Sequence, residues 1–371
     1  MDRTVLMTSV LVLTLSRVGP AQISPVPGTN SPIAPTPVTF STNLPEATTT
    51  AAPAAGLNPL TMSASDLAAW GYPPEPDPNA APQANAVWVQ AVTAAQTRIF
   101  PWLVRANRTH GPTLASQSVD LSNSTPVVAS AVNSALGSYN WSGYLNTNPN
   151  PNGALFTSVF AQYVVPRAQQ APGTCTGGWD YSSTWVGLDG AGAGANDVLQ
   201  AGTYADAYCA PDNDGNASNN TATNYSAWYE WYPVNATVIA GLTVKPGDNI
   251  FVEVWSTSTT TGNVFVVDLN TQQYVSVNLT APAGVQVAGG SAEWITECPS
   301  ISGSLTTLTN YTSEYLSGAF AVDSNGATYA PAVSTPIVMV DQNMKPISYP
   351  TLLGTNAIQI QNTGSSMTGP Q

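Results

Sequence analysis

From residue 139 to its end, the chain is a succession of short runs in which apolar and polar residues alternate. Examples are SVFAQYVVP at 158–166, NIFVEVWSTS at 249–258 and NVFVVDLN at 263–270. Because neighbouring side chains of a strand point to opposite faces, such runs suit strands with one buried face. Gly, Asn, Asp and Pro separate the runs, and no helical pattern lies between them. The spacing predicts an all-β, antiparallel sandwich or barrel, with one domain over residues 138–371.

The chain before residue 138 has a different composition. Residues 22–60 are rich in Pro, Thr and Ala, which predicts an extended, disordered segment. Residues 64–110 are helix-compatible in part, with Pro101 as a break. The basic residues of this stretch are Arg98, Arg105, Arg108 and the single histidine, His110. We expect residues 22–137 to be a largely irregular, partly helical and basic segment ahead of the β domain.

The first residues, MDRTVLMTSVLVLTLSRVGPAQ, contain an apolar run from Thr4 to Ser16 that follows Arg3. The run is too short to span a bilayer and has the length of a signal-peptide core. The small residues Gly19 and Ala21 come next. We expect a signal peptide over residues 1–21 and therefore a secreted protein.

Charged residues are scarce and mostly acidic. Only 8% of the chain is charged, and 21 Asp and Glu stand against 8 Lys and Arg, for a net charge of -13. A chain with this balance does not attract nucleic acid or an anionic membrane, so we expect neither as a partner. The composition suits acid, because few positive charges remain to repel one another once the carboxylates are protonated.

Three cysteines allow one disulfide in an oxidising compartment. Cys175 and Cys209 flank one segment and are the expected pair, which leaves Cys298 over. None of the three has the Cys-x-x-Cys spacing of a zinc or redox site.

The scarcity of histidine excludes several kinds of catalytic site from the β domain. Because His110 precedes that domain, a Ser-His-Asp or Cys-His site, or a histidine-ligated zinc, has no histidine there. The sequence has no Asp-Thr-Gly or Asp-Ser-Gly and no glycine-rich nucleotide-binding motif. We expect no metal and no cofactor. The carboxylates, amides and hydroxyls that remain suit hydrolysis with a carboxylate as acid or base.

Two of the few carboxylates share one strand face. SAEWITECPS, residues 291–300, places Glu293 and Glu297 four residues apart. With nearby aromatic residues, the pair is compatible with a secreted glycoside hydrolase or a carbohydrate-binding β-sandwich. In a regular strand, however, Cα atoms four apart are separated by about 13 Å, whereas retaining glycosidases hold their carboxyl groups about 5–5.5 Å apart. A non-catalytic adhesin of the same fold is another alternative.

Six motifs occur in an order that resembles a known family. They are NWSGY (140–144), SVFAQYVVP (158–166), STWVGLDG (183–190), DVLQAG (197–202), SAWYEWYP (226–233) and SAEWITE (291–297). Together they resemble the glutamic peptidases, the eqolisins of peptidase family G1. The resemblance implies a two-sheet β-sandwich of the concanavalin-like jelly-roll type. It also implies a secreted endopeptidase that cleaves polypeptides in acid, resists pepstatin and is made as a zymogen.

The resemblance also assigns roles to single residues. It implies that Gln200 and Glu297 are catalytic, with Glu297 as general base and then acid, and the Gln200 amide holding the water and the oxyanion. Glu293 then has a supporting position. The residues that the resemblance places along the substrate cleft are Trp185, Asp189 and Glu230.

The opposite charges of the two parts of the chain suggest a role for the first part. A basic segment over residues 64–110 would cover an acidic cleft near neutral pH and loosen once the cleft carboxylates protonate. Self-cleavage would follow. A folding aid or spacer is the alternative. We expect the chain to be a monomer and its own propeptide, within residues 22–137, to be its inhibitor.

Overall fold

The structure is a computed structural model, and it describes residues 36–54, 56–120, 134–147, 153–191, 197–211 and 220–364. From Pro37 onward the chain forms one compact unit. The predicted signal peptide, residues 1–21, lies outside the described residues and stays a prediction. No helix within the described ranges is long and apolar enough to cross a membrane.

One antiparallel layer carries most of the motifs of the resemblance and is called the site sheet. Its strands are, in spatial order, β7 (Trp141–Asn146), β17 (Ala292–Glu297), β10 (Ser183–Asp189), β11 (Val198–Ala210), β12 (Asn220–Tyr232), β13 (Thr237–Ala240) and β4 (Trp102–Arg105). The short β9 (Gly178–Asp180) pairs with the far end of β11.

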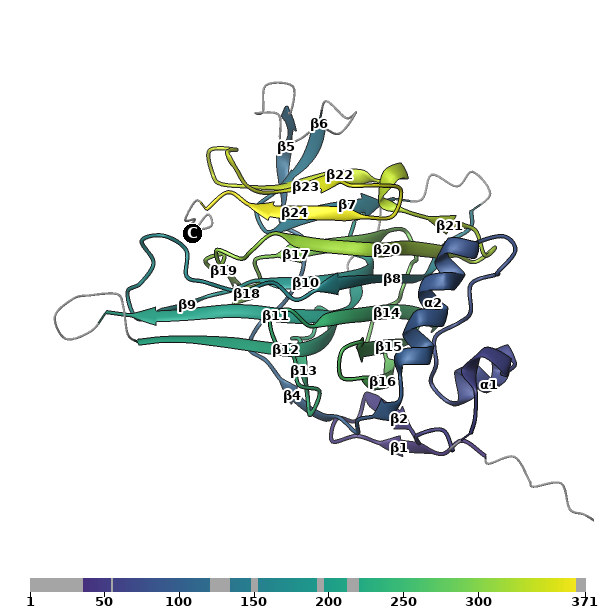
Figure 1. Ribbon diagram of the computed structural model, residues 1–371. Coiled ribbons are helices and arrows are strands. Elements are labelled where there is room, and N and C mark those ends of the chain that lie inside the picture. Colours follow the sequence, from purple (N-terminus) through teal and green to yellow (C-terminus); the bar gives the residue numbers. More distant parts are fainter. Residues whose placement is uncertain are drawn as a thin grey trace, which may run out of the picture. The chain divides into compact units, whose positions relative to one another are not determined.

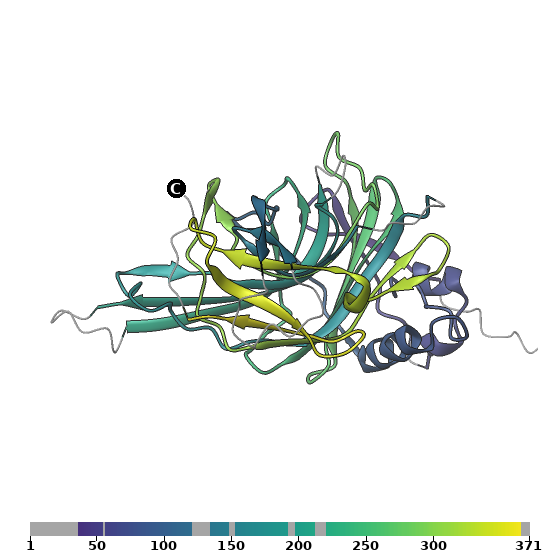
Figure 2. The same cartoon turned by 90° about the horizontal axis from the view of Figure 1, so that it is seen from above.

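A second antiparallel layer is called the partner sheet. Its strands are, in spatial order, β16 (Gln273–Thr280), β15 (Thr261–Asp268), β14 (Asn249–Ser258), β8 (Phe156–Val164) and β20 (Glu314–Asp323). From β20 the hydrogen bonding continues through β24 (Ile358–Asn362), β23 (Pro346–Leu352) and β22 (Thr335–Val340) to β7. The two sheets are therefore joined along one edge (Figures 1 and 2).

Short elements complete the described fold. They are β5 (Leu114–Asp120), β6 (Ser134–Ser138), β18 (Ser300–Ile301), β19 (Ser304–Leu305), β21 (Thr328–Tyr329) and the 3-10 helices η1 (Pro59–Thr61) and η2 (Pro331–Val333). β6 pairs in parallel with β22, and β5 pairs with β6.

The core lies between the two sheets and follows from the alternation along each strand. Val186 and Leu188 of β10 lie in the same buried apolar cluster as Val252 and Val254 of β14. Each such side chain contributes about 1.5–3 kcal/mol when it leaves water. The prediction of an all-β, antiparallel two-sheet sandwich is confirmed.

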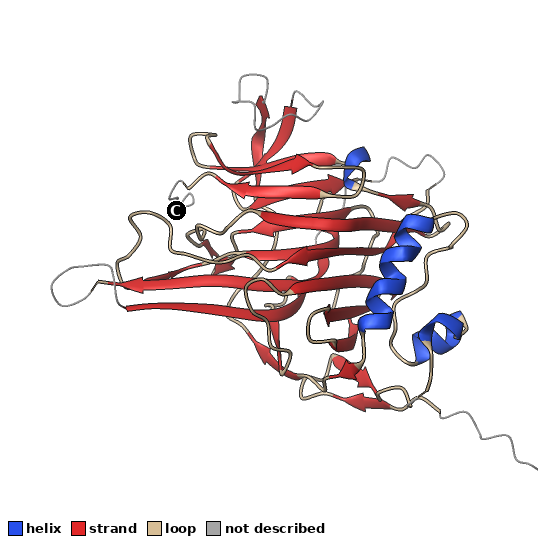
Figure 3. Ribbon diagram, in the orientation of Figure 1, coloured by secondary structure: helices blue, strands red, loops and turns tan. Residues whose placement is uncertain are grey.

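The predicted helical character before the sandwich is also confirmed. α1 (Ala64–Ala69) and α2 (Pro82–Ala94) fall within residues 64–110, and α2 lies across the strands of the partner sheet (Figure 3). Trp88 of α2 is fully buried and packs in one cluster with Phe160 and Phe251 of that sheet. The outer face of the partner sheet is therefore covered by the chain's own N-terminal part.

The Pro/Thr-rich stretch is more ordered than its composition predicts. β1 (Thr39–Ser41) and β2 (Ala47–Thr50) extend the partner sheet beyond β16, and β3 (Thr97–Arg98) also pairs with β16. The expectation of a disordered segment is wrong for residues 39–50. Threonine favours strands, and the Thr49 hydroxyl donates to the Ser276 carbonyl at 2.8 Å. That residues 22–137 are a propeptide stays a prediction.

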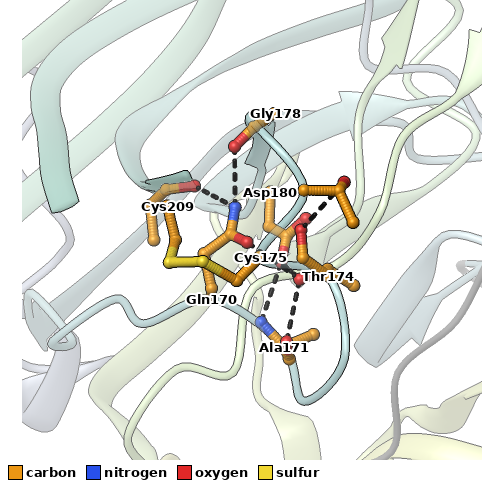
Figure 4. Close-up of a disulfide and its surroundings, with 9 residues drawn as sticks. Gln170, Ala171, Thr174, Cys175, Gly178, Asp180 and Cys209 are labelled. Carbon is orange, nitrogen blue, oxygen red and sulfur yellow. Dashed lines mark hydrogen bonds between the residues drawn. A yellow bond between two sulfur atoms is a disulfide. The ribbon is translucent and has the colours of Figure 1, made fainter. Parts of the chain in front are cut away.

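The disulfide prediction is confirmed. Cys175 and Cys209 are bonded, with their Cα atoms 4.8 Å apart, and Cys298 is free and buried. Figure 4 shows the bridge beside a loop that Asp180 holds through bonds from the Ala171 N–H at 2.8 Å and the Thr174 hydroxyl at 2.6 Å. The bridge ties this loop to the far end of β11.

Candidate active site

The face of the site sheet that points away from the partner sheet gathers aromatic and polar side chains. Alternation sends Leu199 and Ala201 of β11 into the core between the sheets, and it sends Gln200 to the other face. Gln200 is directly opposite Glu230 of β12. Two strands away, Glu297 of β17 is opposite Trp141 of β7. The sequence-predicted pair therefore lies on one face of one sheet.

Glu297 is fully buried and accepts two hydrogen bonds. The Asn140 amide donates to Oε1 and the Trp185 indole N–H donates to Oε2, each at 2.9 Å. Burial, assisted by the nearby carboxyl of Glu230, raises the pKa of Glu297 well above its usual value. The two donors oppose that rise, because they bind the charged form most strongly.

Gln200 is also fully buried, and its two amide atoms have different surroundings. Nε2 donates to the main-chain carbonyl of His110 at 2.5 Å. Oε1 has no hydrogen-bond partner among the described residues. A buried amide with a donor on a peptide carbonyl and a free acceptor beside it can hold both an oxyanion and a water molecule.

Residues 108–113, called the inserted segment, run through this site. His110 is fully buried; its main-chain N–H donates to Glu230 Oε2 at 3.0 Å, and its Nδ1 is 2.7 Å from the same oxygen. The imidazole stacks on Trp228, with ring centres 3.9 Å apart, and is bounded by Tyr204 on β11. Burial is the main cause that lowers the pKa of His110 well below its usual value, and the charge of Arg108 adds to it.

The Asn140 side chain links Glu297 to the same segment. The Asn140 amide donates to the Gly111 carbonyl at 2.7 Å and to Glu297 Oε1 at 2.9 Å. Gln200 binds the preceding carbonyl, that of His110. The candidate pair is therefore connected to two consecutive carbonyl groups of one bound chain segment.

Charge and main-chain bonds hold the start of the inserted segment. Arg108 forms two bonds to the Asp206 carboxylate, at 3.2 and 3.0 Å, and its guanidinium lies 3.9 Å above the Tyr204 ring. Thr109 exchanges main-chain hydrogen bonds with Ser300 at 2.9 and 3.0 Å. These contacts fix the direction in which the segment passes the pair.

The structure brings two of the three predicted cleft residues to the pair. Trp185 contacts Glu297, and Glu230 contacts His110; burial raises the pKa of Glu230 well above its usual value. Asp189, at the end of β10, instead accepts main-chain hydrogen bonds from residues 288–290 at 2.7–3.0 Å. The bonds of Asp189 therefore hold a loop. Glu293 is fully buried on the same strand as Glu297.

Sequence reasoning missed several residues of the site. Alternation outward from Gln200 and Glu230 would have found Tyr204 and Trp228, which lie on the same strand faces. Asn140 lies inside the NWSGY motif, but the resemblance assigns it no role. The position of His110 carries no local signal, because it is set by contacts with residues 90 and 120 positions away.

The site contains an amide N–H that donates to a peptide carbonyl, a buried carboxyl and a bound peptide segment, which are the parts that amide hydrolysis needs. In the part of the chain that the structure describes, no group of three or more His, Cys, Asp and Glu side chains is placed to hold a metal ion.

Comparison with known proteins identifies the family. The Peptidase A4 family matches residues 139–362. Aspergillopepsin-2 of Aspergillus niger is 29% identical over 212 residues, which cover 53% of this chain and 69% of that protein. Scytalidopepsin B of Scytalidium lignicola is 33% identical over 159 residues, which cover 43% of this chain and 51% of that protein.

Solved structures of the same kind are similar to this chain. Scytalido-glutamic peptidase with a transition state analog inhibitor is 24% identical, with a TM-score of 0.49, over 61% of this chain and 98% of that one. Aspergilloglutamic peptidase from Aspergillus niger is 28% identical, with a TM-score of 0.43, over 50% of this chain and 99% of that one. With the family match over residues 139–362, the chain belongs to the Peptidase A4 family, the glutamic peptidases, and is a hydrolase that acts on peptide bonds.

Proposed function

We propose that the protein is a secreted, pepstatin-insensitive acid endopeptidase that is made as a zymogen and uses Gln200 and Glu297 as its catalytic pair. One observation carries the assignment of the pair. The Gln200 amide binds one carbonyl of a bound peptide, and Glu297 shares the Asn140 amide with the next carbonyl. Two side chains 97 positions apart thus meet on adjacent peptide groups.

The chemistry follows from the two contacts. Ionised Glu297 takes a proton from water, and the water oxygen bonds to the substrate carbonyl carbon. The oxyanion that forms accepts the hydrogen bond of Gln200 Nε2, which strengthens as the charge develops. Glu297 then returns the proton to the leaving nitrogen, and the carbon–nitrogen bond breaks.

An acid working range agrees with the surroundings of Glu297. An ordinary glutamate has a pKa of about 4.3 and supplies a base only above that value. The Trp185 and Asn140 donors stabilise the carboxylate. In the present state Glu297 is buried, and burial raises its pKa. Release of the segment would rehydrate the carboxylate and lower the pKa towards the acid range.

The zymogen proposal rests on the occupant of the site. The inserted segment belongs to the chain's own residues 22–137 and contacts both proposed catalytic residues or their immediate partners. A polypeptide substrate cannot reach Gln200 while His110 occupies it. We therefore propose that this part of the chain is a propeptide that inhibits the enzyme. We also propose that the protein acts as a monomer.

The test is an acid protease assay on casein at about pH 2–4, with pepstatin, on wild type, Glu297→Gln and Gln200→Ala. We expect pepstatin-insensitive hydrolysis that both variants lose. General acid–base catalysis contributes about 10²–10⁴ to the rate, and an oxyanion donor contributes about 10²–10³. Activity retained in both folded variants would contradict the pair. Clearing of polysaccharide in place of casein would favour a glycoside hydrolase.

A further inference from the structure

We infer that the peptide bond between His110 and Gly111 is the bond that the enzyme hydrolyses in its own chain. The inference rests on the proposed function, since it uses the same catalytic pair. It adds a defined cleavage site, a side-chain requirement on each side of that site, and a new N-terminus.

The first observation is the placement of this one peptide group. Its carbonyl oxygen, that of His110, accepts the Gln200 amide at 2.5 Å, which is the contact expected of an oxyanion donor. The residue beyond the bond, Gly111, is held through its carbonyl by Asn140 at 2.7 Å. The same Asn140 amide binds Glu297 Oε1. The proposed donor thus contacts the carbonyl of this bond, and the proposed base is linked through Asn140 to the carbonyl of the next residue.

The second observation is that main-chain hydrogen bonds bind the segment on both sides of the bond, as they bind an extended peptide substrate. Before it, Thr109 exchanges two bonds with Ser300. After it, the Thr113 N–H donates to Asn140 Oδ1 at 2.8 Å, and the Thr113 carbonyl accepts the Tyr139 N–H at 2.9 Å. A segment that only blocked the site could do so with side chains; this one presents its backbone.

The third observation is that side chains on the acyl side fill formed pockets. The His110 ring stacks on Trp228 and is bonded at Nδ1 to Glu230. Two residues earlier, Arg108 pairs with Asp206 and lies on the Tyr204 ring. These contacts favour an aromatic or imidazole side chain before the bond and an arginine two positions further upstream.

The fourth observation is that the leaving side is tightly packed at Gly111. A Cβ atom added at Gly111 would lie 2.8 Å from the Tyr232 ring, closer than real Cβ contacts allow. Proline, which resists cleavage through its tertiary amide, occurs at position 112 and not at either residue of the bond. Overpacking of this kind costs about 1–3 kcal/mol.

The hydrolysis balances with water as the only co-reactant. Water gives a proton to Glu297, and its oxygen bonds to the His110 carbonyl carbon. The oxyanion is held by Gln200. Glu297 passes the proton to the Gly111 nitrogen, the carbon–nitrogen bond breaks, and the products are a carboxylate at His110 and an amine at Gly111.

The two products would not separate at once. Residues before the cleaved bond still pair with the sandwich through β4 and β2, and Trp88 of α2 stays in its apolar cluster. Cleavage must therefore be measured on denatured protein, because a native size measurement would not detect it.

The experiment uses the full chain, purified near neutral pH, shifted to about pH 3 and then denatured for mass spectrometry and N-terminal sequencing. We expect the sequence Gly-Pro-Thr of Gly111 as the first new N-terminus, and no such product from Glu297→Gln. Gly111→Val should slow its appearance about tenfold or more, which is the rate equivalent of the overpacking cost. Gly354→Val is the matched control, because an added Cβ there meets nothing within 4 Å.

A peptide of residues 105–115 keeps the test informative if Gly111→Val fails to fold. The active enzyme should cut it between His and Gly, and replacing its arginine at position 108 by alanine should slow the cut. Cleavage of chain and peptide only at other bonds, by an enzyme that digests casein, would overturn the inference and leave the proposed function standing. Absence of casein digestion by wild type would overturn both.

Discussion

The site sheet and the inserted segment are both buried, but burial acts on their ionisable groups in opposite directions. Glu230 and Glu297 on the sheet have raised pKa values because burial disfavours their charged forms. His110 on the segment has a lowered pKa for the same reason, with Arg108 adding to the effect. Carboxyls become neutral in acid and histidine becomes charged. Acid therefore suits the sheet and opposes the segment that fills its site.

Burial raises the pKa of carboxyl groups in the rest of the sandwich as well. Burial raises the pKa of Glu253 to about 8 and that of Glu314 to about 7. The stability that these neutral carboxyls contribute is fully present below their unfolded pKa of about 4.3 and is lost as the pH rises through the folded values. The sandwich should be most stable in acid.

The docking of the inserted segment depends on pH in the opposite direction. His110 is surrounded by Glu230 and Trp228 of β12, by Tyr204 and Gln200 of β11, and by Arg108 of its own segment. Its docking is complete above the free histidine pKa of about 6.5 and is lost as the pH falls through the lower folded value. Burial also raises the pKa of Asp206, so that acid weakens the partner of Arg108.

The largest expected effect separates the chemistry of the sheet from its stability. Gln200→Ala should lower kcat for casein by about 10²–10³, because it removes the proposed oxyanion donor, while thermal unfolding of the matured enzyme changes little. Glu293→Gln is the control: it lies on the same strand face as Glu297 and makes no bond to the inserted segment, so its activity should stay within a few-fold of wild type. Equal losses in both variants would contradict the assignment.

A smaller effect is expected from the segment's charged contact. Arg108→Ala should raise the casein activity of the unprocessed chain at about pH 6 by about tenfold or more, since charge-assisted bonds contribute about 1.5–3 kcal/mol. Arg105→Ala is matched to it. Arg105 also pairs with a carboxylate, Glu46, but both side chains are about a third exposed (34% and 30%), against 12% and 1% for Arg108 and Asp206. Similar activation by both changes would argue against docking through Arg108.

The histidine itself sets the pH response of the segment. His110→Phe keeps an aromatic ring on Trp228 but cannot be protonated. The casein activity of the unprocessed chain at about pH 4 should fall roughly tenfold below that of the unprocessed wild type, which corresponds to one pKa unit of lost driving force for release of the segment, and it should depend less on pH. Thr109→Ser, which keeps the main-chain bridge to Ser300, should behave like wild type. An unchanged pH profile in His110→Phe would place the pH sensor elsewhere.

The smallest effect tests the sandwich alone. Thermal melting of the matured enzyme should show a falling Tm from about pH 5 to 8, as the buried carboxyls are forced to ionise. Glu253→Gln should reduce this fall in Tm by a few degrees, because the amide keeps the hydrogen bond from Ser158 and never ionises. A Tm that rises towards pH 8 would reverse the assigned signs.

Much of the sandwich could be predicted because its information is local. Alternation in runs such as NVFVVDLN fixes both the strand and its buried face. It also places Gln200 and Glu297 on strand faces that form one face of the sheet once the strands pair. The cysteine pair could be predicted because Cys175 and Cys209 flank one segment. The order of six motifs then supplied the family.

The remaining features depend on contacts that no local pattern encodes. The Thr-rich stretch at 39–50 becomes strand because an edge of the partner sheet is available to it. His110 reaches Glu230 across 120 positions of sequence. Asp189 matches a motif position, yet its bonds go to a loop 99–101 residues away. A motif therefore locates a residue on a strand but does not say which neighbour its side chain will bind.

Hydrogen exchange on the full-length Glu297→Gln chain tests the opposite pH responses of the two regions most directly. Exchange is measured near pH 7 and pH 4, corrected for the chemical exchange rate, and compared between peptides covering residues 106–113 and the strands β10 and β11. We predict that residues 106–113 are protected near pH 7 and lose protection at pH 4, while the strands keep theirs. Equal protection of the segment at both pH values, or opening of the strands first, would contradict the account.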